Sequence, residues 1–205
     1  EKTLDIHRRL LGEEHPATLR SMNNLAATFW AQGDLPSARG LQEKTLDIHR
    51  RVLGEEHPDA LRSMNNLAST LSKQGDLPGA RILQEKALDI RRCVLSEEHP
   101  DTLTSMSNLA STLRAQGDLP GARVLQEKTL DISRRVLGEE HPATSLSAFN
   151  LFATLLQMEG LEAAQPFYRD HLAWLLQRDP ARLGADQRNI QGQLFQLFPQ
   201  QNPTP

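Results

Sequence analysis

Four asparagines recur at equal distances along this 205-residue chain and are its strongest candidates for ligand chemistry. Successive copies lie 42 residues apart, each directly before a leucine, and they are Asn24, Asn66, Asn108 and Asn150. A side-chain amide both donates and accepts hydrogen bonds, so it can hold a peptide backbone whatever the peptide's side chains are. In a structural alternative, each amide bonds a neighbouring helix. Asparagine is a mediocre helix former, so its recurrence needs one of these two reasons.

Polar and basic residues accompany the asparagines in the same segments. Asn23 and Asn65 stand one residue earlier in two copies, and the basic residues nearby are Arg20, Arg62, Lys73 and Arg114. These segments are almost free of acidic residues, so a surface that they form is neutral to positive and favours an acidic or carboxylate-bearing partner. Ordinary solvated charge is an equally good account, because Thr104 and Leu146 interrupt the arginine series.

The other reactive side chains indicate no enzyme. Cys93 is the only cysteine, which excludes an internal disulfide framework and a zinc site built on paired thiols. Four histidines recur before prolines, where they suit helix starts, and a whole repeat separates successive copies, which are His15, His57, His99 and His141. The remaining histidines are predicted to be surface residues, namely His7, His49 and His171. No phosphate-binding loop, dinucleotide fingerprint or nucleophile elbow occurs, so we expect no catalysis, no metal and no cofactor.

Charge and hydropathy disfavour nucleic-acid and membrane partners. The net charge is −3, and the paired arginines near Arg8, Arg50, Arg91 and Arg134 are predicted to be solvated and compensated by glutamate pairs in the loops. No apolar run approaches the roughly 20 residues that cross a bilayer, and the first residues, EKTLDIHRRL, lack the order of a secretory signal. We therefore expect a cytoplasmic protein. It begins inside a repeat without an initiator methionine, which we expect of a piece of something longer.

The elements that position these residues are repeated helical hairpins. The segment EKTLDI begins at Glu1, Glu43 and Glu127, and EKALDI begins at Glu85, again in steps of 42. Apolar residues between these markers follow helical spacing, and Gly75 with Pro78 separates two helices of one unit. The spacing predicts a truncated leading helix over 1–11 and helix pairs over 16–53, 58–95, 100–137 and 142–177. The first helices are expected near 16–32, 58–74, 100–116 and 142–158, and the second near 36–53, 78–95, 120–137 and 161–177.

One hairpin cannot bury its apolar face alone, whereas stacked hairpins form a continuous core. The sequence therefore predicts an all-α solenoid over residues 1–178. The fourth unit carries more aromatic residues, as expected of a terminal repeat whose outer face meets no further copy. A linker and capping helix are expected over 179–198, with the helix near 186–197, and a flexible tail over 199–205.

The repeated residues identify a family resemblance. NNLA, then LxxQGD, an alanine four residues beyond the aspartate, and EKxLDIxRRxLGEEHP resemble the tetratricopeptide repeat. They are more closely similar to the long variant found in kinesin light chains and bacterial signalling proteins, over roughly residues 1–175. The resemblance implies a right-handed superhelix of antiparallel helix pairs in which the first helices line a concave groove, with an asparagine ladder along it. It also implies signature packing positions at Leu67, Ala68, Leu71, Gly75, Leu77, Ala80 and Ala87.

We therefore expect a scaffold that binds a protein or peptide, with an extended and acidic partner segment held in the groove. One alternative is a sensor or autoinhibitory arm of a larger signalling protein, such as a nucleotide-driven switch or a protease. Another is self-assembly, in which arrays stack end to end through the open leading helix. Trp30 is expected to make an aromatic contact near the groove edge.

Overall fold

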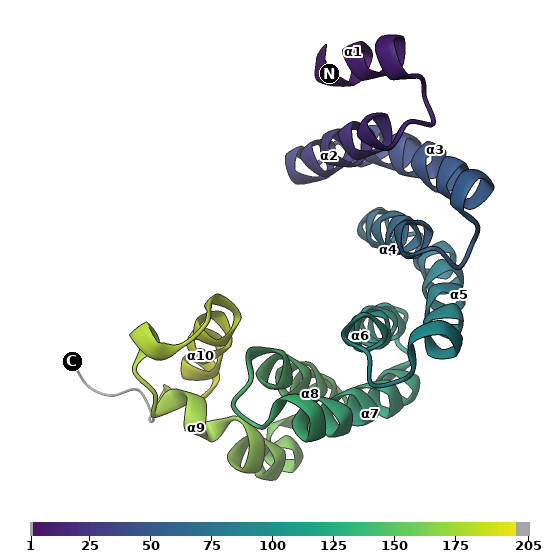
Figure 1. Ribbon diagram of the computed structural model, residues 1–205. Coiled ribbons are helices and arrows are strands. Elements are labelled where there is room, and N and C mark those ends of the chain that lie inside the picture. Colours follow the sequence, from purple (N-terminus) through teal and green to yellow (C-terminus); the bar gives the residue numbers. More distant parts are fainter. Residues whose placement is uncertain (1, 200–205) are drawn as a thin grey trace. The chain divides into compact units, whose positions relative to one another are not determined.

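The computed structural model describes residues 2–199, and within them the chain is helical with no strand (Figure 1). It divides into two compact units, unit 1 over residues 1–97 and unit 2 over residues 98–205. Both consist of antiparallel helix pairs, so the all-α fold of repeated hairpins is confirmed. The predicted division into an array, a linker with a cap, and a tail stays a prediction, and residues 200–205 of that tail lie outside the described residues.

Unit 1 contains a leading helix and two hairpins. Its helices are α1 (Lys2–Leu11), α2 (Pro16–Gln32), α3 (Leu35–Leu53), α4 (Pro58–Lys73) and α5 (Leu77–Leu95). Helices α2 and α3 pair closely, as do α4 and α5, while α1 packs on α2 and α3 packs on α4. The first hairpin of unit 1 therefore contacts the second one mainly through its second helix, α3.

Side-chain caps set the helix boundaries in each hairpin. His57 precedes α4, and its Nδ1 accepts a hydrogen bond from the backbone N–H of Asp59 at 3.1 Å. The other three histidines of this series make the same bond at the same distance, which confirms their role at helix starts. Before α5, Gly75 takes a left-handed conformation (φ 88°) and the Asp76 carboxylate accepts from the Gly79 N–H at 3.0 Å. These bonds satisfy amide groups that a helix start leaves without partners.

Small residues allow the two helices of a hairpin to approach closely. Ala68 on α4 and Ala80 on α5 are completely buried, and Met64 fills the space beside them. Their equivalents in the next hairpin, Ala110 and Ala122, are buried to the same extent. A larger residue at these positions would force the helices apart, because protein interiors are packed at the density of crystals.

Ion pairs join the loops to the second helices. In unit 1, Arg50 lies 3.2 Å from Glu55 and Arg51 lies 2.8 Å from Glu14 of the preceding loop. In unit 2, Arg135 pairs with Glu98 at 2.6 Å. The predicted compensation between arginines and loop glutamates is confirmed. Because these side chains are exposed, each pair contributes only about 0–1 kcal/mol.

Unit 2 begins with a regular hairpin and then departs from the repeat. Its elements are α6 (Pro100–Ala115), α7 (Leu119–Leu137), α8 (Pro142–His171), α9 (Ala173–Leu176), η1 (Pro180–Arg182) and α10 (Ala185–Leu197). Helix α8 spans both helices of the fourth hairpin, with a break at Gly160, and a second break at Leu172 separates α9. The single second helix predicted over 161–177 is therefore divided. Gln191 of α10 holds the turn that ends α9, since its amide donates to the carbonyls of Leu175 and Arg178 at 2.7 and 2.9 Å.

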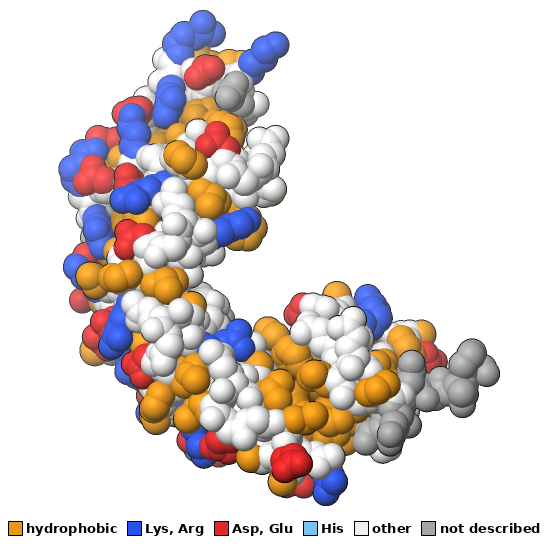
Figure 2. Space-filling model, turned by 180° about the vertical axis from the view of Figure 1, so that it is seen from behind, with side chains coloured by type: hydrophobic (Ala, Val, Ile, Leu, Met, Phe, Trp, Pro, Cys, Tyr) orange, Lys and Arg blue, Asp and Glu red, His pale blue; other side chains and the backbone are white. Residues whose placement is uncertain are grey.

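Helix α10 caps unit 2, as predicted, by packing on α8 and α9. Ile190 and Leu194 are buried in this contact, and Phe198 stacks on Tyr168 with ring centroids 4.0 Å apart. Phe152 of α8 completes the aromatic cluster, 6.1 Å from the Tyr168 ring. Figure 2 shows hydrophobic side chains gathered on the surface of unit 2 between α8 and α10. The aromatic residues of the fourth hairpin therefore pack against a helix of their own chain.

Candidate functional site

The structure places the predicted site residues on the first helices of the hairpins. Their positions are Arg20, Asn23 and Asn24 on α2, Arg62, Asn65, Asn66 and Lys73 on α4, Asn108 and Arg114 on α6, and Asn150 on α8. Asn24 is exposed, and the other three ladder asparagines are half-buried. Within residues 2–199, none of the four ladder amides makes a hydrogen bond. The structural alternative, an amide bonded to a neighbouring helix, is not found there, and the ligand role stays a prediction.

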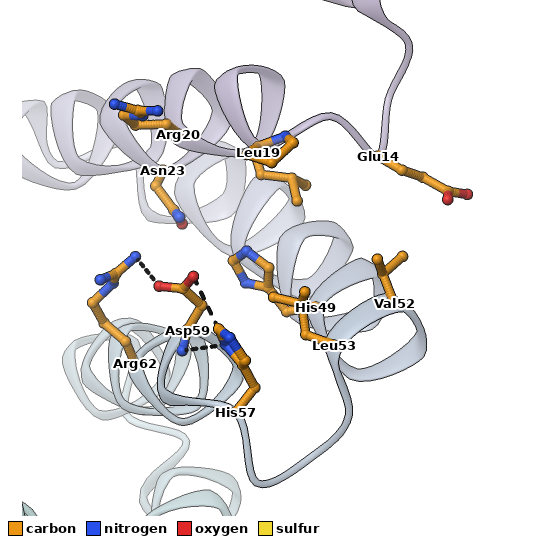
Figure 3. A pocket seen from close by; sticks show the side chains of 11 residues that line it. Glu14, Leu19, Arg20, Asn23, His49, Val52, Leu53, His57, Asp59 and Arg62 are labelled. Carbon is orange, nitrogen blue, oxygen red and sulfur yellow. Dashed lines mark hydrogen bonds and ion pairs between the residues drawn. The ribbon is translucent and has the colours of Figure 1, made fainter.

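A cavity of about 460 Å³, here called the arginine cavity, lies between the first half of α2, the end of α3 and the start of α4 (Figure 3). Four apolar residues form part of its wall, namely Pro16, Leu19, Val52 and Leu53. Its polar lining comprises Glu14, Arg20, Asn23, His49, His57, Asp59 and Arg62. An apolar wall with a few polar groups is typical of a site that holds one end of a ligand.

The two arginines of this cavity differ in their electrostatic partners. Arg62 lies 2.6 Å from the Asp59 carboxylate, which neutralises much of its charge. Arg20 occupies the equivalent place on α2, where Ala17 stands at the position of the aspartate. Within the described part of the chain, the Arg20 side chain forms no ion pair or hydrogen bond, and it is exposed. Arg20 is therefore the guanidinium of this cavity that is free for an anionic ligand.

The prediction that His49 is a surface residue is wrong. Only 4% of it is exposed, and its Nδ1 lies 2.9 Å from the Ser63 hydroxyl across the contact between α3 and α4. Burial lowers the pKa of His49, because a charged imidazolium is disfavoured away from water. His7 and His171 are half-buried as well, and Arg91, predicted to be solvated, is buried at the position of His49 in α5. His49 faces the next hairpin of unit 1, a contact that the periodicity of a single helix did not reveal.

A second cavity, here called the amide cavity, has a volume of about 240 Å³ and adjoins the first through Asn23, which lines both. Its lining residues are Asn23, Ala27 and Trp30 of α2, Gln42 of α3, and Asn66 and Ser69 of α4. The ammonium group of Lys73 lies 3.8 Å from the centre of the Trp30 ring, close enough for a cation–π interaction. Lys73 itself does not line this cavity. The aromatic contact expected of Trp30 near the groove edge stays a prediction.

Gln42 is a site residue that the sequence reasoning missed. It is 6% exposed and lines the amide cavity, yet its Oε1 is buried without a partner. Gln84 and Gln126, at 42-residue steps, are buried in the same way. The available signal was a glutamine in three second helices, always four residues after the packing alanine.

The polar pattern ends in unit 2. Helix α6 still presents Asn108 and Arg114, and neither side chain has a partner in the described region. On α8, however, Leu146 and Phe149 occupy the positions that Arg62 and Asn65 hold on α4. The asparagine ladder therefore reaches α8 only through Asn150, beside apolar neighbours.

Among residues 2–199, no group of three or more histidine, cysteine, aspartate or glutamate side chains could hold a metal ion. None of the described helices is long and apolar enough to cross a membrane.

Comparison with known proteins identifies the repeat. A family model described as tetratricopeptide repeat matches residues 1–48 and 24–93, and a second model with that description matches residues 102–143. Together these matches cover more than half of the chain. No curated protein matches it.

Solved structures of kinesin light chain-like repeat proteins have the same fold. One is a protein of Podosopora anserina described as a kinesin light chain with nearly identical TPR-like repeats, at 28% identity and a TM-score of 0.71, covering 93% of this chain and 83% of that chain. A variant of that protein is 27% identical to this chain and has a TM-score of 0.73, and the match covers 94% of this chain and 84% of the variant. BtubC from P. vanneervenii, at 20% identity, has a TM-score of 0.71 over 81% of this chain and 66% of its own, and supports the fold alone. The predicted resemblance is confirmed.

Proposed function

Since the chain belongs to the tetratricopeptide repeat family, whose fold supports protein-interaction scaffolds, we propose that it holds an extended, acidic partner segment against α2 and α4. One observation carries this proposal. Arg20, Asn23 and Asn66 line two adjoining cavities, and within the described residues these side chains have no hydrogen-bond or ion-pair partner. Polar groups that are placed at a cavity and left without partners are available to a ligand.

The asparagines suit a peptide backbone. Asn23 comes from α2 and Asn66 from α4, so a segment in the amide cavity can be bonded from two neighbouring hairpins. Each amide supplies both a donor and an acceptor, which matches the N–H and C=O of a peptide unit irrespective of its side chain. This chemistry supports binding of an extended segment, because an isolated extended backbone leaves its N–H and C=O groups free, whereas the interior of a helix pairs them internally.

Arg20 supplies the preference for an acidic partner. Its guanidinium can form a bidentate pair with a carboxylate, and no carboxylate of the described chain competes for it. Arg62 contributes less, since Asp59 already holds it. We propose an acidic side chain of the partner at the arginine cavity, next to a backbone segment at the amide cavity.

The remaining predicted residues form an outer set in this proposal. They line neither cavity and are Asn24, Asn65, Asn108, Asn150 and Arg114. Asn65 carries a buried Oδ1 without a partner, and the others also lack a side-chain hydrogen bond in the described region. We expect substitution of one of these to weaken binding less than substitution of Asn23 or Asn66.

A peptide array, followed by titration of a selected peptide, tests the proposal. The double variant Asn23→Ala, Asn66→Ala should weaken binding at least about tenfold, which corresponds to about 1.4 kcal/mol. Asn24→Ala is the matched control, because Asn24 is exposed and lines neither cavity. Thermal unfolding of both variants should stay close to that of the parent chain. Unchanged affinity in the double variant would exclude the asparagine mechanism.

The acidic preference has its own test. Affinity for the selected peptide should fall as salt concentration rises, since exposed charges are screened. Arg20→Gln should remove most of this salt dependence, whereas Arg62→Gln should change it less because Asp59 already neutralises Arg62. Equal salt dependence in the parent and in Arg20→Gln would show that Arg20 does not bind the partner's acid.

A further inference from the structure

Gln42 differs from the other residues of the amide cavity because it belongs to the interior. It lies on the second helix α3, whereas the other lining residues belong to the first helices α2 and α4. More than nine-tenths of its surface is buried, and in the described residues its amide has no hydrogen-bond partner. A buried polar group without a partner is unfavourable for the fold, so its presence at a cavity points to a ligand that completes it.

The groups around Gln42 are polar but uncharged. Asn23 and Asn66 add two amides, Ser69 adds a hydroxyl, and the Trp30 indole N–H is buried without an acceptor. No charged side chain lines this cavity, and the nearby Lys73 ammonium lies over the Trp30 ring. The cavity therefore offers both donors and acceptors with no net charge.

We propose that the amide cavity binds a primary carboxamide, the asparagine or glutamine side chain of the partner segment. This inference rests on the proposed function and adds a specificity to it. A carboxamide donates and accepts at once, so it can pair with Gln42 while the Trp30 N–H donates to its oxygen. The volume of about 240 Å³ suits one side chain and lies below the range typical of small-molecule sites.

Other side chains fit this cavity less well. A carboxylate only accepts hydrogen bonds and would be buried without a cation in the lining, which is costly. An aliphatic side chain would leave the amides and the indole unpaired. A lysine would bring a second positive charge close to Lys73. The partner is thus expected to place an amide residue here, next to the acidic residue at the arginine cavity.

Nuclear magnetic resonance of the whole chain tests this inference, with N-acetyl-glutamine-N-methylamide as the probe. The indole N–H signal of Trp30 and the side-chain amide signals of Gln42 should shift saturably as the probe is added. Trp174 is an internal control, because its indole already donates to the His171 carbonyl at 3.2 Å. The corresponding glutamate and leucine derivatives should need a concentration at least about tenfold higher than the glutamine probe to shift the Trp30 signal equally. Equal or stronger effects of either derivative, or no saturable shift with the glutamine probe, would overturn the inference.

Gln42→Met separates binding from folding, since methionine is similar in size and has no amide. We expect this variant to raise the melting temperature, because an unpaired buried amide is removed, and to abolish the Trp30 response to the probe. Gln126→Met, at the equivalent buried position of α7, should raise the melting temperature without changing that response. A full Trp30 response in Gln42→Met would overturn the inference.

The same measurements distinguish this inference from the proposed function. If a selected acidic peptide binds in an Asn23- and Asn66-dependent manner but Gln42→Met leaves its affinity unchanged, the groove function stands and the carboxamide specificity is wrong. If the glutamine probe binds but no peptide does, the amide cavity binds a carboxamide and the proposed binding of an extended acidic segment is wrong.

Discussion

The hairpins of unit 1 and the capped end of unit 2 carry different side chains at equivalent positions. In unit 1, α4 presents Arg62 and Asn65. In unit 2, α8 carries Leu146 and Phe149 at those positions. The second helices differ too, since Tyr168 stands where the earlier ones have glutamine, and it stacks on Phe198 at 4.0 Å. One position thus leaves a cavity open to a ligand, whereas its equivalent is filled by the chain itself.

Hairpins with the same backbone fold can therefore differ in role, because their side chains differ. A surface of polar side chains without partners stays exposed and can bind a ligand. A surface of apolar side chains is instead covered by a helix such as α10. The two tryptophans report on the two regions separately, because Trp30 lies in α2 and Trp174 in α9.

The largest effect is expected at the centre of the aromatic cluster. Phe152 is completely buried, with its ring 6.1 Å from Tyr168 and 6.4 Å from Phe198. Phe152→Ala should lower the free energy of unfolding by about 3–5 kcal/mol, because it removes buried apolar surface and leaves a cavity. Urea unfolding followed by Trp174 fluorescence, in a Trp30→Phe background, measures the loss. A loss below about 1 kcal/mol would show that α10 is not held by this cluster.

A smaller effect is expected at Ser96, which has a positive φ of 82°. Glycine occupies the equivalent positions Gly54 and Gly138, with φ of 89° at both. Ser96→Gly should stabilise the chain by about 1–3 kcal/mol, since this backbone region is unfavourable for any residue with a side chain. Thermal unfolding by circular dichroism measures the gain. The matched control Gly138→Ser should lose a similar amount, and equal stability of both variants with the parent would contradict the prediction.

Part of this organisation could be predicted from the sequence. The histidine, glycine and proline residues at hairpin boundaries act locally, so the first three hairpins begin and end close to the predicted residues. The fourth hairpin did not follow, because its second helix breaks at Leu172 and packs against α10, a helix far away in the sequence. The capping helix was predictable from its apolar spacing.

The site was predictable only in outline. The asparagine ladder is visible as a repeat, yet the amide cavity combines Asn23 of one hairpin with Asn66 of the next, which depends on how hairpins stack. Gln42 and His49 appear polar and hence exposed in sequence, but stacking buries both. Contacts between neighbouring hairpins, rather than periodicity within one helix, decide which polar residues face a ligand.

A pH-dependent effect should distinguish the two units. Because burial lowers the pKa of His49, the unfolded chain takes up a proton at this residue at a higher pH than the folded chain does. Stability from the neutral imidazole is present above about pH 6.5, the ordinary histidine value, and is lost as pH falls through the lowered folded pKa. Unfolding monitored by Trp30 should therefore become easier in mild acid.

His49→Ser is the matched variant for this effect, since Ser133 holds the equivalent position in unit 2. It should weaken the acid dependence reported by Trp30. Burial also lowers the pKa of His171, so the dependence reported by Trp174 should persist in the variant. An unchanged Trp30 profile would show that His49 does not cause the acid sensitivity of unit 1.

The smallest effect concerns the cations beside the two tryptophans. The Lys73 ammonium lies 3.8 Å from the Trp30 ring centre, whereas the Arg178 guanidinium lies 5.8 Å from that of Trp174. Lys73→Ala should cost about 0.5–1 kcal/mol and alter the emission of Trp30. Arg178→Ala should alter the emission of Trp174 less, because the guanidinium lies near the distance limit. Equal spectral changes at the two tryptophans would contradict this difference.

The ion pairs between loops and second helices bear on how the number of repeats can change in evolution. Arg135 pairs with Glu98, 37 positions earlier, and Arg51 pairs with Glu14 at the same separation. Contacts of this kind extend no farther than the adjacent hairpin, so gain or loss of one complete 42-residue copy preserves them. Recombination between the segments that encode the repeats can therefore lengthen or shorten the gene in whole steps, while the segment that encodes α10 keeps its place after the last copy. Natural variants are expected to differ in length by multiples of 42 residues.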